Sequence, residues 1–349
     1  MTSGTIPVRE EDAFDVDSLH RWMLEVAPDL AAGARPVIEQ FPGGASNLTY
    51  LVRYPAGDVV LRRPPRGHKA ASAHDMGREV TVQQHLLPLY PLVPRILGYC
   101  QDDSVIGGEF YVMQSIDGVI LRRDLPEGMD LSQSEARTLA ETIIDAQADL
   151  HGIDPVVAGL EGLGRGPGYV GRQVSGWSRR YRDARTDDVP EAEDVMAWLV
   201  ARQPEDVGAR LIHGDWRFDN LVLDLGGAPR VVGVLDWEMA TVGDPLMDLG
   251  SSLAYWITAD DDAALQMLRR QPTHLPGIPT REQYVQRYLA RTGLATDDWT
   301  FYEVFGLFRL AVILQQIWYR YRRGETTNPA FAMFGAGVTV LVDEARRRM

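Results

Sequence analysis

The feature that most constrains this chain is the segment 213–220, which reads HGDWRFDN. It places Asp215 directly after a His-Gly pair and Asn220 five residues after that acid. Asp236 comes sixteen residues after Asn220, at the end of the apolar run 231–235, which predicts a strand. An acid, an amide and a second acid in this order, with a predicted β-hairpin between the last two, indicate a polar functional site.

Each of these residues fits a role in kinase-type phosphoryl transfer, which asks a protein for positioning and charge neutralisation. Asp215 can accept the proton of an attacking hydroxyl group. Asn220 and Asp236 offer the amide and carboxylate oxygens that Mg²⁺ takes as ligands. An isolated HGD would more often hold a turn, and Asp236 alone could cap its strand, but the joint spacing favours catalysis. Arg217 is a further candidate, either as a γ-phosphate contact or as a surface arginine.

The turn GGASN lies between the first two predicted strands and is a candidate phosphate-covering loop. Small residues let backbone N–H groups approach phosphates closely. Such a segment is often an ordinary hairpin turn, but its position favours nucleotide binding. The candidate residues are Gly43, Gly44, Ser46 and Asn47.

The third predicted strand ends in VVLR, and Arg62 stands where kinases carry a phosphate-anchoring lysine. Glu79 lies in the next predicted helix and is placed to pair with Arg62. Arginine forks, so it can bind two phosphate oxygens at once. Arg63 is on the opposite strand face and is the weaker candidate. The alternative is a surface arginine with a solvated glutamate.

Three other polar residues near the motif are expected to support it, and a fourth is left open. We expect His213 to brace the loop through hydrogen bonds, since the mechanism needs one proton acceptor. Asp244 and Asp248 are expected to cap a helix and brace the same loop. Glu238 follows Asp236 closely, so a minor metal role is left open.

Residues 1–116 are expected to form a small first lobe after a polar lead-in. Asp17 is a possible cap for a short helix, and one more helix is expected after the third of five strands. The predicted strands are 36–41, 48–54, 59–63, 97–100 and 110–115, and the predicted helices are 17–26 and 76–87.

Residues 117–349 are expected to be mainly helical. Ser132 and Glu135 form a capping box, and the dipeptide 244–245 is an Asp-Pro helix start. Helices are predicted at 170–185 and 191–201, and a further apolar helix near 301–321 has a longest apolar run too short to span a membrane.

Composition excludes some functions. The formal net charge of −14 argues against a nucleic acid or a membrane surface as partner, because both need basic patches. The single cysteine, Cys100, cannot form an internal disulfide bond, which favours a reducing cytoplasm. Residues 1–20 lack the apolar region of a signal peptide.

Four segments together resemble the aminoglycoside phosphotransferase-like family of kinase-fold enzymes: HGDWRFDN, LDWEMATVGDPLMDLG, GGASNLTYLV and FYVMQSIDG. The segments GYVGRQVSGWSRRY and FYEVFGLFRLAVILQQIWYRYRRG are more specifically similar to the branch of kinase domains fused to some acyl-CoA dehydrogenases. The resemblance, which runs from about residue 36 to the C-terminus, implies a protein-kinase-like α+β fold. Its two lobes would be a five-stranded antiparallel sheet with a helix, and a mainly helical lobe.

The same resemblance implies the ligands. ATP would lie between the lobes, with GTP left open, and Mg²⁺ would be held by Asn220 and Asp236. The chain departs from protein kinases at Arg62, at the Trp-Glu pair after Asp236, and in its short glycine loop. The adenine would contact the hinge residues Met113, Gln114, Ser115 and Ile116.

The acceptor is expected to be a small molecule with a hydroxyl group, and the arginine pattern favours an anionic one. Polycationic aminoglycosides need a carboxylate-rich pocket, whereas the region where family members build that pocket is rich in arginine here. These arginines are either solvated surface residues or part of the cleft; if they face the cleft, a hydroxyacyl-CoA fits. An aminoglycoside kinase and a nucleotide-binding regulatory module remain the alternatives. The arginines are Arg165, Arg172, Arg179, Arg180, Arg182, Arg185, Arg320, Arg322 and Arg323.

Overall fold

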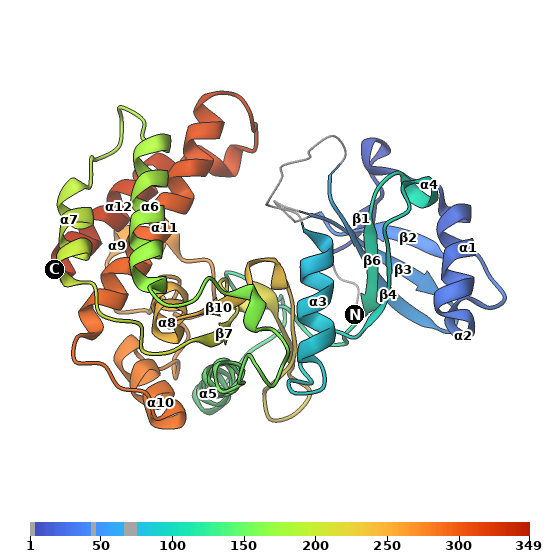
Figure 1. The fold of residues 1–349 in the computed structure, drawn as a ribbon, viewed down its shortest axis with the longest axis horizontal. Coiled ribbons are helices and arrows are strands. Elements are labelled where there is room, and N and C mark those ends of the chain that lie inside the picture. The colour runs from blue at the N-terminus through green and yellow to red at the C-terminus, as the bar shows by residue number, and fades with distance from the viewer. Residues whose placement is uncertain (1–3, 43–46, 66–74) are drawn as a thin grey trace. The chain divides into compact units, whose positions relative to one another are not determined.

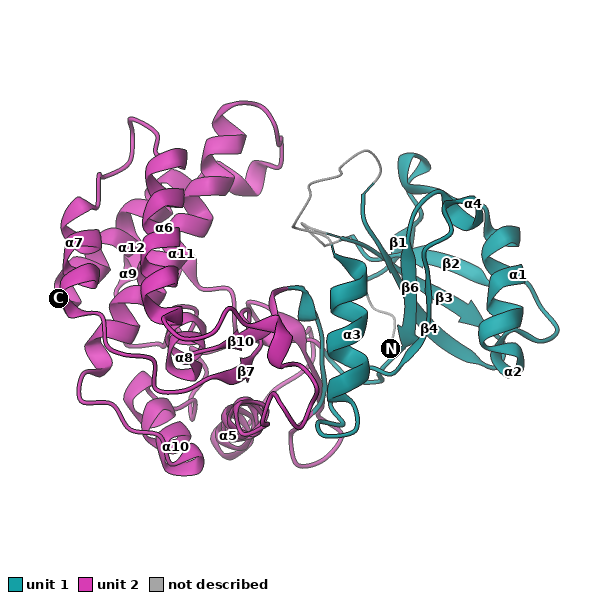
Figure 2. Cartoon of the chain, viewed as in Figure 1, with its two compact units in different colours: residues 1–119, 232–238 teal, residues 120–231, 239–349 magenta. Residues whose placement is uncertain are grey.

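The computed structural model describes residues 4–42, 47–65 and 75–349. The predicted loop residues Gly43, Gly44 and Ser46 lie outside the described residues. The chain forms two compact units, which Figure 2 colours separately. Unit 1 comprises residues 1–119 and 232–238, and unit 2 comprises residues 120–231 and 239–349. The assignment of nucleotide and acceptor functions to residues 1–116 and 117–349 stays a prediction.

Unit 1 is built on an antiparallel six-stranded sheet in the order β1-β2-β3-β4-β6-β5. The sequence predicted five strands; the additional one, β1, has only two residues and pairs Ile6 with Gln40. A two-residue strand has no alternation by which a sequence could reveal it. The strands are β1 (Ile6–Pro7), β2 (Val37–Gln40), β3 (Leu48–Tyr54), β4 (Gly57–Arg63), β5 (Ile96–Cys100) and β6 (Phe110–Gln114).

Helices cover both faces of this sheet (Figure 1). Leu19 and Met23 of α1 pack in one buried cluster with Phe110 of β6, whereas Met76 of α3 packs in another with Tyr111. Since successive strand residues point to opposite faces, α1 and α3 lie on opposite sides. The helices are η1 (Glu10–Asp12), α1 (Val16–Val26), α2 (Pro28–Ala31), α3 (Met76–Leu86) and α4 (Asp103–Ile106).

The first helix corrects one prediction. Its N-cap is Asp15, whose Oδ1 accepts from the N–H groups of Asp17 at 2.9 Å and Ser18 at 3.1 Å. The prediction of Asp17 as cap was wrong. Asp15 and Asp17 are both acids that can cap a helix, and the backbone conformation before the helix decides which of them is the N-cap.

Unit 2 is mainly helical, as expected. The predicted capping box of Ser132 and Glu135 is confirmed at the start of α5, and the Asp-Pro helix start at α8. The helices are α5 (Gln133–His151), η2 (Glu161–Leu163), α6 (Tyr169–Ala184), α7 (Glu193–Arg202), η3 (Phe218–Asn220), η4 (Trp237–Met239), α8 (Pro245–Leu253), α9 (Ala263–Leu268), α10 (Arg281–Thr292), α11 (Trp299–Arg322), η5 (Pro329–Phe331) and α12 (Phe334–Arg348). The short strands are β7 (Arg210–Ile212), β8 (Leu221–Asp224), β9 (Arg230–Val234) and β10 (Thr241–Gly243), of which β9, like the helix η4, contains residues assigned to both units.

The helix α11 is the core of unit 2 and packs against α8, α12 and α6 (Figure 1). A Cβ at Gly306 would lie only 2.1 Å from the carbonyl oxygen of Gly250, so α8 and α11 meet backbone to backbone. Within the described chain, α11 is the one helix long and apolar enough to cross a membrane, and 67% of its apolar window is buried inside the structure. It is the buried helix that the sequence predicted near 301–321.

Candidate active site

The loop between β7 and β8 brings three predicted site residues of unit 2 into contact. Asn220 Nδ2 donates to the carbonyl oxygen of Asp215 at 2.8 Å and to its Oδ2 at 2.9 Å. Arg217 Nε donates to the same Oδ2 at 3.2 Å. Asp215 Oδ1 therefore has no hydrogen-bond partner among the described residues and is the oxygen that an incoming hydroxyl could meet. Burial would lower the pKa of Arg217, but the carboxylate of Asp215 raises it and keeps the guanidinium charged.

The buried residue Asp248 accepts hydrogen bonds from the start of this loop, as expected. Asp248 of α8 accepts from Gly214 N at 2.9 Å and from His213 N at 3.3 Å. His151 Nε2 lies 3.1 Å from Asp248 Oδ2, and its Nδ1 lies 2.5 Å from the hydroxyl of Tyr288. Burial alone would raise the pKa of Asp248, but its hydrogen bond to His151 and the charge of Arg309 hold the pKa below its usual value.

The brace expected of His213 and the helix cap expected of Asp244 are confirmed, whereas the hydrogen bonds of Asp244 lie outside the loop 213–220. Asp215 N donates to His213 Nδ1 at 3.2 Å, which fixes the start of the loop. Asp244 caps α8 by accepting from Leu246 N and Met247 N, and its Oδ2 accepts from Val207 N at 2.7 Å.

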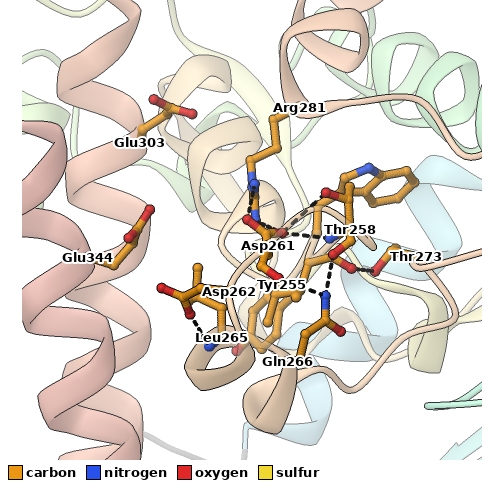
Figure 3. Close-up of polar contacts among 12 residues, drawn as sticks. Tyr255, Thr258, Asp261, Asp262, Leu265, Gln266, Thr273, Arg281, Glu303 and Glu344 are labelled. Atoms are coloured by element: carbon orange, nitrogen blue, oxygen red, sulfur yellow. Dashed lines mark hydrogen bonds and ion pairs between the residues drawn. The ribbon is translucent and has the colours of Figure 1, made fainter.

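The segment between α8 and α10 forms a hydrogen bond with the second half of the loop, at Phe218. Gln271 accepts from Phe218 N at 2.7 Å and donates to the carbonyl oxygen of Tyr255 at 3.0 Å. Figure 3 shows how this segment is fastened: Arg281 donates to both carboxylate oxygens of Asp261, at 2.9 and 2.7 Å. These contacts link α10 to the segment that orders the end of the loop 213–220, our candidate catalytic loop.

Arg309 is a site residue that the sequence did not single out. It lies on α11, is buried, and donates from Nη2 to the carbonyl oxygen of Gly214 at 2.6 Å. Gly214 has a φ of 81°, and a Cβ there would lie 2.8 Å from the carbonyl oxygen of Met239, so glycine is required. The signal in the sequence was a lone arginine within an otherwise apolar helical run.

In unit 1, Arg62 is the centre of an acidic cluster. Its Nη1 donates to Glu79 Oε1 at 2.7 Å, which is the ion pair expected from the sequence. Its Nη2 donates to Asp236 Oδ1 at 3.1 Å and lies 3.9 Å from Glu238 Oε2. Arg63 instead donates to the carbonyl oxygen of Ile106, in agreement with its predicted position on the other face.

The Arg62–Glu79 pair is deeply buried, with 9% and 1% of the two side chains exposed. Burial raises the pKa of Glu79, against the opposing charge of Arg62 and the hydrogen bond that Tyr111 donates at 2.7 Å. Burial would lower the pKa of Arg62, but the negative groups around it raise that pKa, so the arginine stays charged. Removing one partner of such a pair leaves an uncompensated buried charge.

The backbone at Asp236 carries strain. With a φ of 65°, it is one of two non-glycine residues in the described chain with a positive φ, the other being Ala192. Such positions cost roughly 1–3 kcal/mol and cluster at functional sites. In this conformation the carboxylate of Asp236 accepts the hydrogen bond from Arg62.

Several buried polar atoms near Arg62 have no partner among the described residues. They are Arg62 Nε, Glu79 Oε2 and Asn47 Oδ1. Asn47 itself donates from Nδ2 to Glu238 Oε2 at 3.1 Å. An unpaired guanidinium N–H suits a phosphate oxygen.

The donor atoms also suit Mg²⁺. Because Asn220 uses Nδ2 for both bonds to Asp215, its Oδ1 is the oxygen left for a cation. Within unit 1, Asp236 offers a carboxylate oxygen, and Mg²⁺ favours few protein oxygens completed by waters and phosphates. Among the described residues no group of three or more His, Cys, Asp or Glu side chains could hold a metal alone. Asn220 belongs to unit 2 and Asp236 to unit 1, and their assignment as ligands of Mg²⁺ stays a prediction.

The predicted hinge lies in unit 1. Met113 and Gln114 end β6, and Ser115 and Ile116 follow directly. Gln114 N donates to the carbonyl oxygen of Arg95 at 2.8 Å. The role of these residues in adenine binding stays a prediction.

Most of the arginines considered for the acceptor site have partners of their own. Arg172 donates to the carbonyl oxygens of Pro167 and Gly166. The others with acidic partners form the pairs Arg182–Glu193, Arg185–Glu191, Arg322–Asp188 and Arg323–Glu325. Only a part of the arginine set is thus left for an acceptor.

Known proteins are similar to this chain over nearly its whole length. The model of the phosphotransferase enzyme family matches residues 37–288. Acyl-CoA dehydrogenase family member 10 of Mus musculus is 34% identical over 327 residues, which cover 93% of this chain and 30% of that protein. Acyl-CoA dehydrogenase family member 11 of Gallus gallus is 36% identical over 354 residues, 98% of this chain and 44% of that protein. The chain thus spans less than half the length of either of these two relatives.

Among solved structures, a candidate aminoglycoside phosphotransferase from Ralstonia eutropha JMP134 has a TM-score of 0.81 at 29% identity. The likeness covers 96% of this chain and 98% of the other. It confirms the predicted protein-kinase-like α+β fold.

Proposed function

This chain belongs to the phosphotransferase enzyme family and is a small-molecule kinase, and we propose that it transfers the γ-phosphate of ATP to a hydroxyl group of an anionic metabolite. The observation that carries the proposal is the loop in which Asn220 holds the carboxylate of Asp215 at 2.9 Å. Asp215 is then a fixed proton acceptor with one oxygen left for the acceptor hydroxyl.

We assign separate roles to the other site residues. Arg62, held by Glu79, would bind phosphate oxygens of the nucleotide, helped by Asn47 and the glycine loop. Arg217 would neutralise charge on the transferred phosphoryl group. Mg²⁺, held by Asn220 and Asp236, would supply charge neutralisation at the phosphates.

The acceptor that we favour is a hydroxyacyl thioester of coenzyme A. The relatives named as acyl-CoA dehydrogenases support this choice, because a kinase domain fused to such an enzyme would meet acyl-CoA thioesters. The arginines near the catalytic loop support it as well, since a polycationic antibiotic would be repelled by them. An aminoglycoside remains the second candidate because of the likeness to the Ralstonia eutropha structure.

A panel assay tests the proposal. Purified protein with Mg²⁺ and either ATP or GTP is incubated with hydroxyacyl-CoAs of different chain length or with aminoglycosides, and nucleoside diphosphate release is followed. We expect release that depends on a hydroxyacyl-CoA and ceases with the matched acyl-CoA that lacks the hydroxyl. Turnover of aminoglycosides alone would overturn the acceptor. Nucleotide binding without turnover of any acceptor would favour a regulatory module.

The expected cytoplasmic location stays a prediction.

A further inference from the structure

The ring of Trp177 gathers two positive charges on one side of the catalytic loop. Trp177 lies on α6, which packs against α11 (Figure 1). The guanidinium carbon of Arg180 lies 4.6 Å from the centre of this ring, and that of Arg309 lies 5.1 Å from it. A cation over an indole face is stabilised by roughly 0.5–2 kcal/mol, so the ring holds both arginines in place.

This cluster adjoins the proposed proton acceptor. Arg309 donates to the carbonyl oxygen of Gly214, the residue that precedes Asp215. The phenol of Tyr255 meets the same groups: burial raises its pKa, the charge of Asp215 raises it further, and Arg217 and Arg309 act against both. Asp215, Arg309 and Tyr255 therefore lie within electrostatic reach of one another inside unit 2.

The positive charges of Arg179 and Arg180 are not neutralised by a partner in the described part of the chain. Arg179 and Arg180 form no ion pair or hydrogen bond with any residue that the structure describes, although Arg182 of the same helix pairs with Glu193 at 2.6 Å. Burial, together with the charges of Arg179 and Arg309, lowers the pKa of Arg180. A nearby anion would relieve this repulsion between like charges.

We propose that Arg180 and Arg309, gathered about Trp177, form together with Arg179, the neighbour of Arg180 on α6, an anion subsite that binds a phosphate group of the acceptor. The inference rests on the proposed function, because it assigns the acceptor's charged end to this cluster and its hydroxyl to Asp215. Arg309 links the proposed subsite to Asp215, because its Nη2 donates to the carbonyl oxygen of Gly214 in the catalytic loop. Arg179 and Arg180 keep all their N–H donors for the ligand, and a guanidinium fork matches phosphate geometry.

The subsite predicts which part of an acyl-CoA is recognised. The phosphates of coenzyme A would lie at the cluster, and the acyl chain would extend toward Asp215. A hydroxyacyl-pantetheine carries the same thioester without those phosphates. Only the coenzyme A thioester can therefore form the phosphate interaction with the arginines.

The experiment compares kcat/KM for the two thioesters in the wild-type protein, in the double variant R179Q/R180Q and in the control R182Q. The ratio compared is kcat/KM for the coenzyme A thioester divided by kcat/KM for the pantetheine thioester. In R179Q/R180Q this ratio is expected to fall by about tenfold or more, because charge-assisted hydrogen bonds to a phosphate are lost. R182Q should keep the wild-type ratio, because Glu193 already occupies that guanidinium. An unchanged ratio in the double variant would overturn the subsite.

A binding arm separates failure of the subsite from failure of the proposed function. Coenzyme A itself, which has no acyl hydroxyl, is titrated calorimetrically into protein whose nucleotide site is saturated with Mg²⁺ and a non-hydrolysable ATP analogue. Binding that weakens in R179Q/R180Q but not in R182Q would support the subsite even if no hydroxyacyl-CoA were turned over. Binding of equal strength in all three proteins would refute the subsite and leave the catalytic proposal standing.

Discussion

Nη2 of Arg62 donates to Oδ1 of Asp236 at 3.1 Å, joining two residues that are 174 positions apart in the sequence. Arg62 is our candidate phosphate anchor, and Asp236 is our candidate metal ligand. Their contact lies within unit 1, beside the buried Glu79. A single guanidinium thus orients both the acid of α3 and the acid at the end of β9.

The double role of Arg62 can be tested by Arg62→Lys. The ammonium keeps the charge but loses the fork that contacts Glu79 and Asp236 separately, so the KM for ATP should rise by about tenfold. Steady-state kinetics at saturating acceptor measures it. The matched control is Arg53→Lys in the same sheet, where the arginine pairs with the partly exposed Glu39 and Asp58. Equal effects of the two substitutions would show that Arg62 acts only through general stability.

The support beneath the catalytic loop predicts a pH dependence. Because the folded-state pKa of Asp248 lies below its ordinary value of 3.8, its ionisation stabilises the fold above that value, and this stability is lost as the pH falls through the folded-state pKa. Asp248→Asn should therefore lower the free energy of unfolding by about 1–3 kcal/mol near neutral pH, with a smaller loss as the solution is acidified below the ordinary pKa.

Denaturant unfolding at a series of pH values measures this difference. Asp149→Asn near the end of α5 provides the control, because Asp149 is about half exposed and its pair with Arg291 is expected to contribute little. A loss in Asp248→Asn that stayed constant down to strongly acidic pH would contradict the assigned ionisation.

The contact between α8 and α11 predicts intolerance to a single methyl group. In Gly306→Ala the new Cβ would lie 2.1 Å from the carbonyl oxygen of Gly250, so the helices must separate, at a cost of roughly 1–3 kcal/mol. Gly171→Ala on α6 makes only an ordinary contact of 3.5 Å with Gln203 and should stabilise by about 0.5–1 kcal/mol. Thermal unfolding of both variants gives the comparison, and similar melting temperatures would disprove the close approach.

Local signals in the sequence predicted the parts of this protein that local physics decides. Capping at Ser132 and Asp244 and the buried helix around Arg309 follow from spacing and periodicity, and the pairing of Arg62 with Glu79 follows from the kinase strand pattern. The resemblance supplied the kinase-like fold. The strand β1 and the choice of Asp15 over Asp17 as cap could not be predicted. The strand depends on pairing with β2, and the cap depends on the backbone conformation just before α1.

Long-range polar contacts were beyond reach for the same reason. The hydrogen bond from Arg309 to Gly214 joins segments 95 residues apart, and Gln271 reaches Phe218 across 53 residues. A helical period shows that Arg309 falls within an apolar helix, but it cannot show which carbonyl oxygen satisfies its charge. These contacts become visible only when the packing of α11 and of the segment after α8 is known.

The most direct test of the central claim compares the wild-type protein with Asp215→Asn. Both are given ATP labelled at the γ-phosphate, Mg²⁺ and a hydroxyacyl-CoA, and label in the thioester is measured at equal nucleotide occupancy. We predict labelled product from the wild type, and a rate roughly 10²–10⁴-fold lower in Asp215→Asn with nucleotide affinity retained. Transfer at the wild-type rate by Asp215→Asn would contradict the role of Asp215 as proton acceptor.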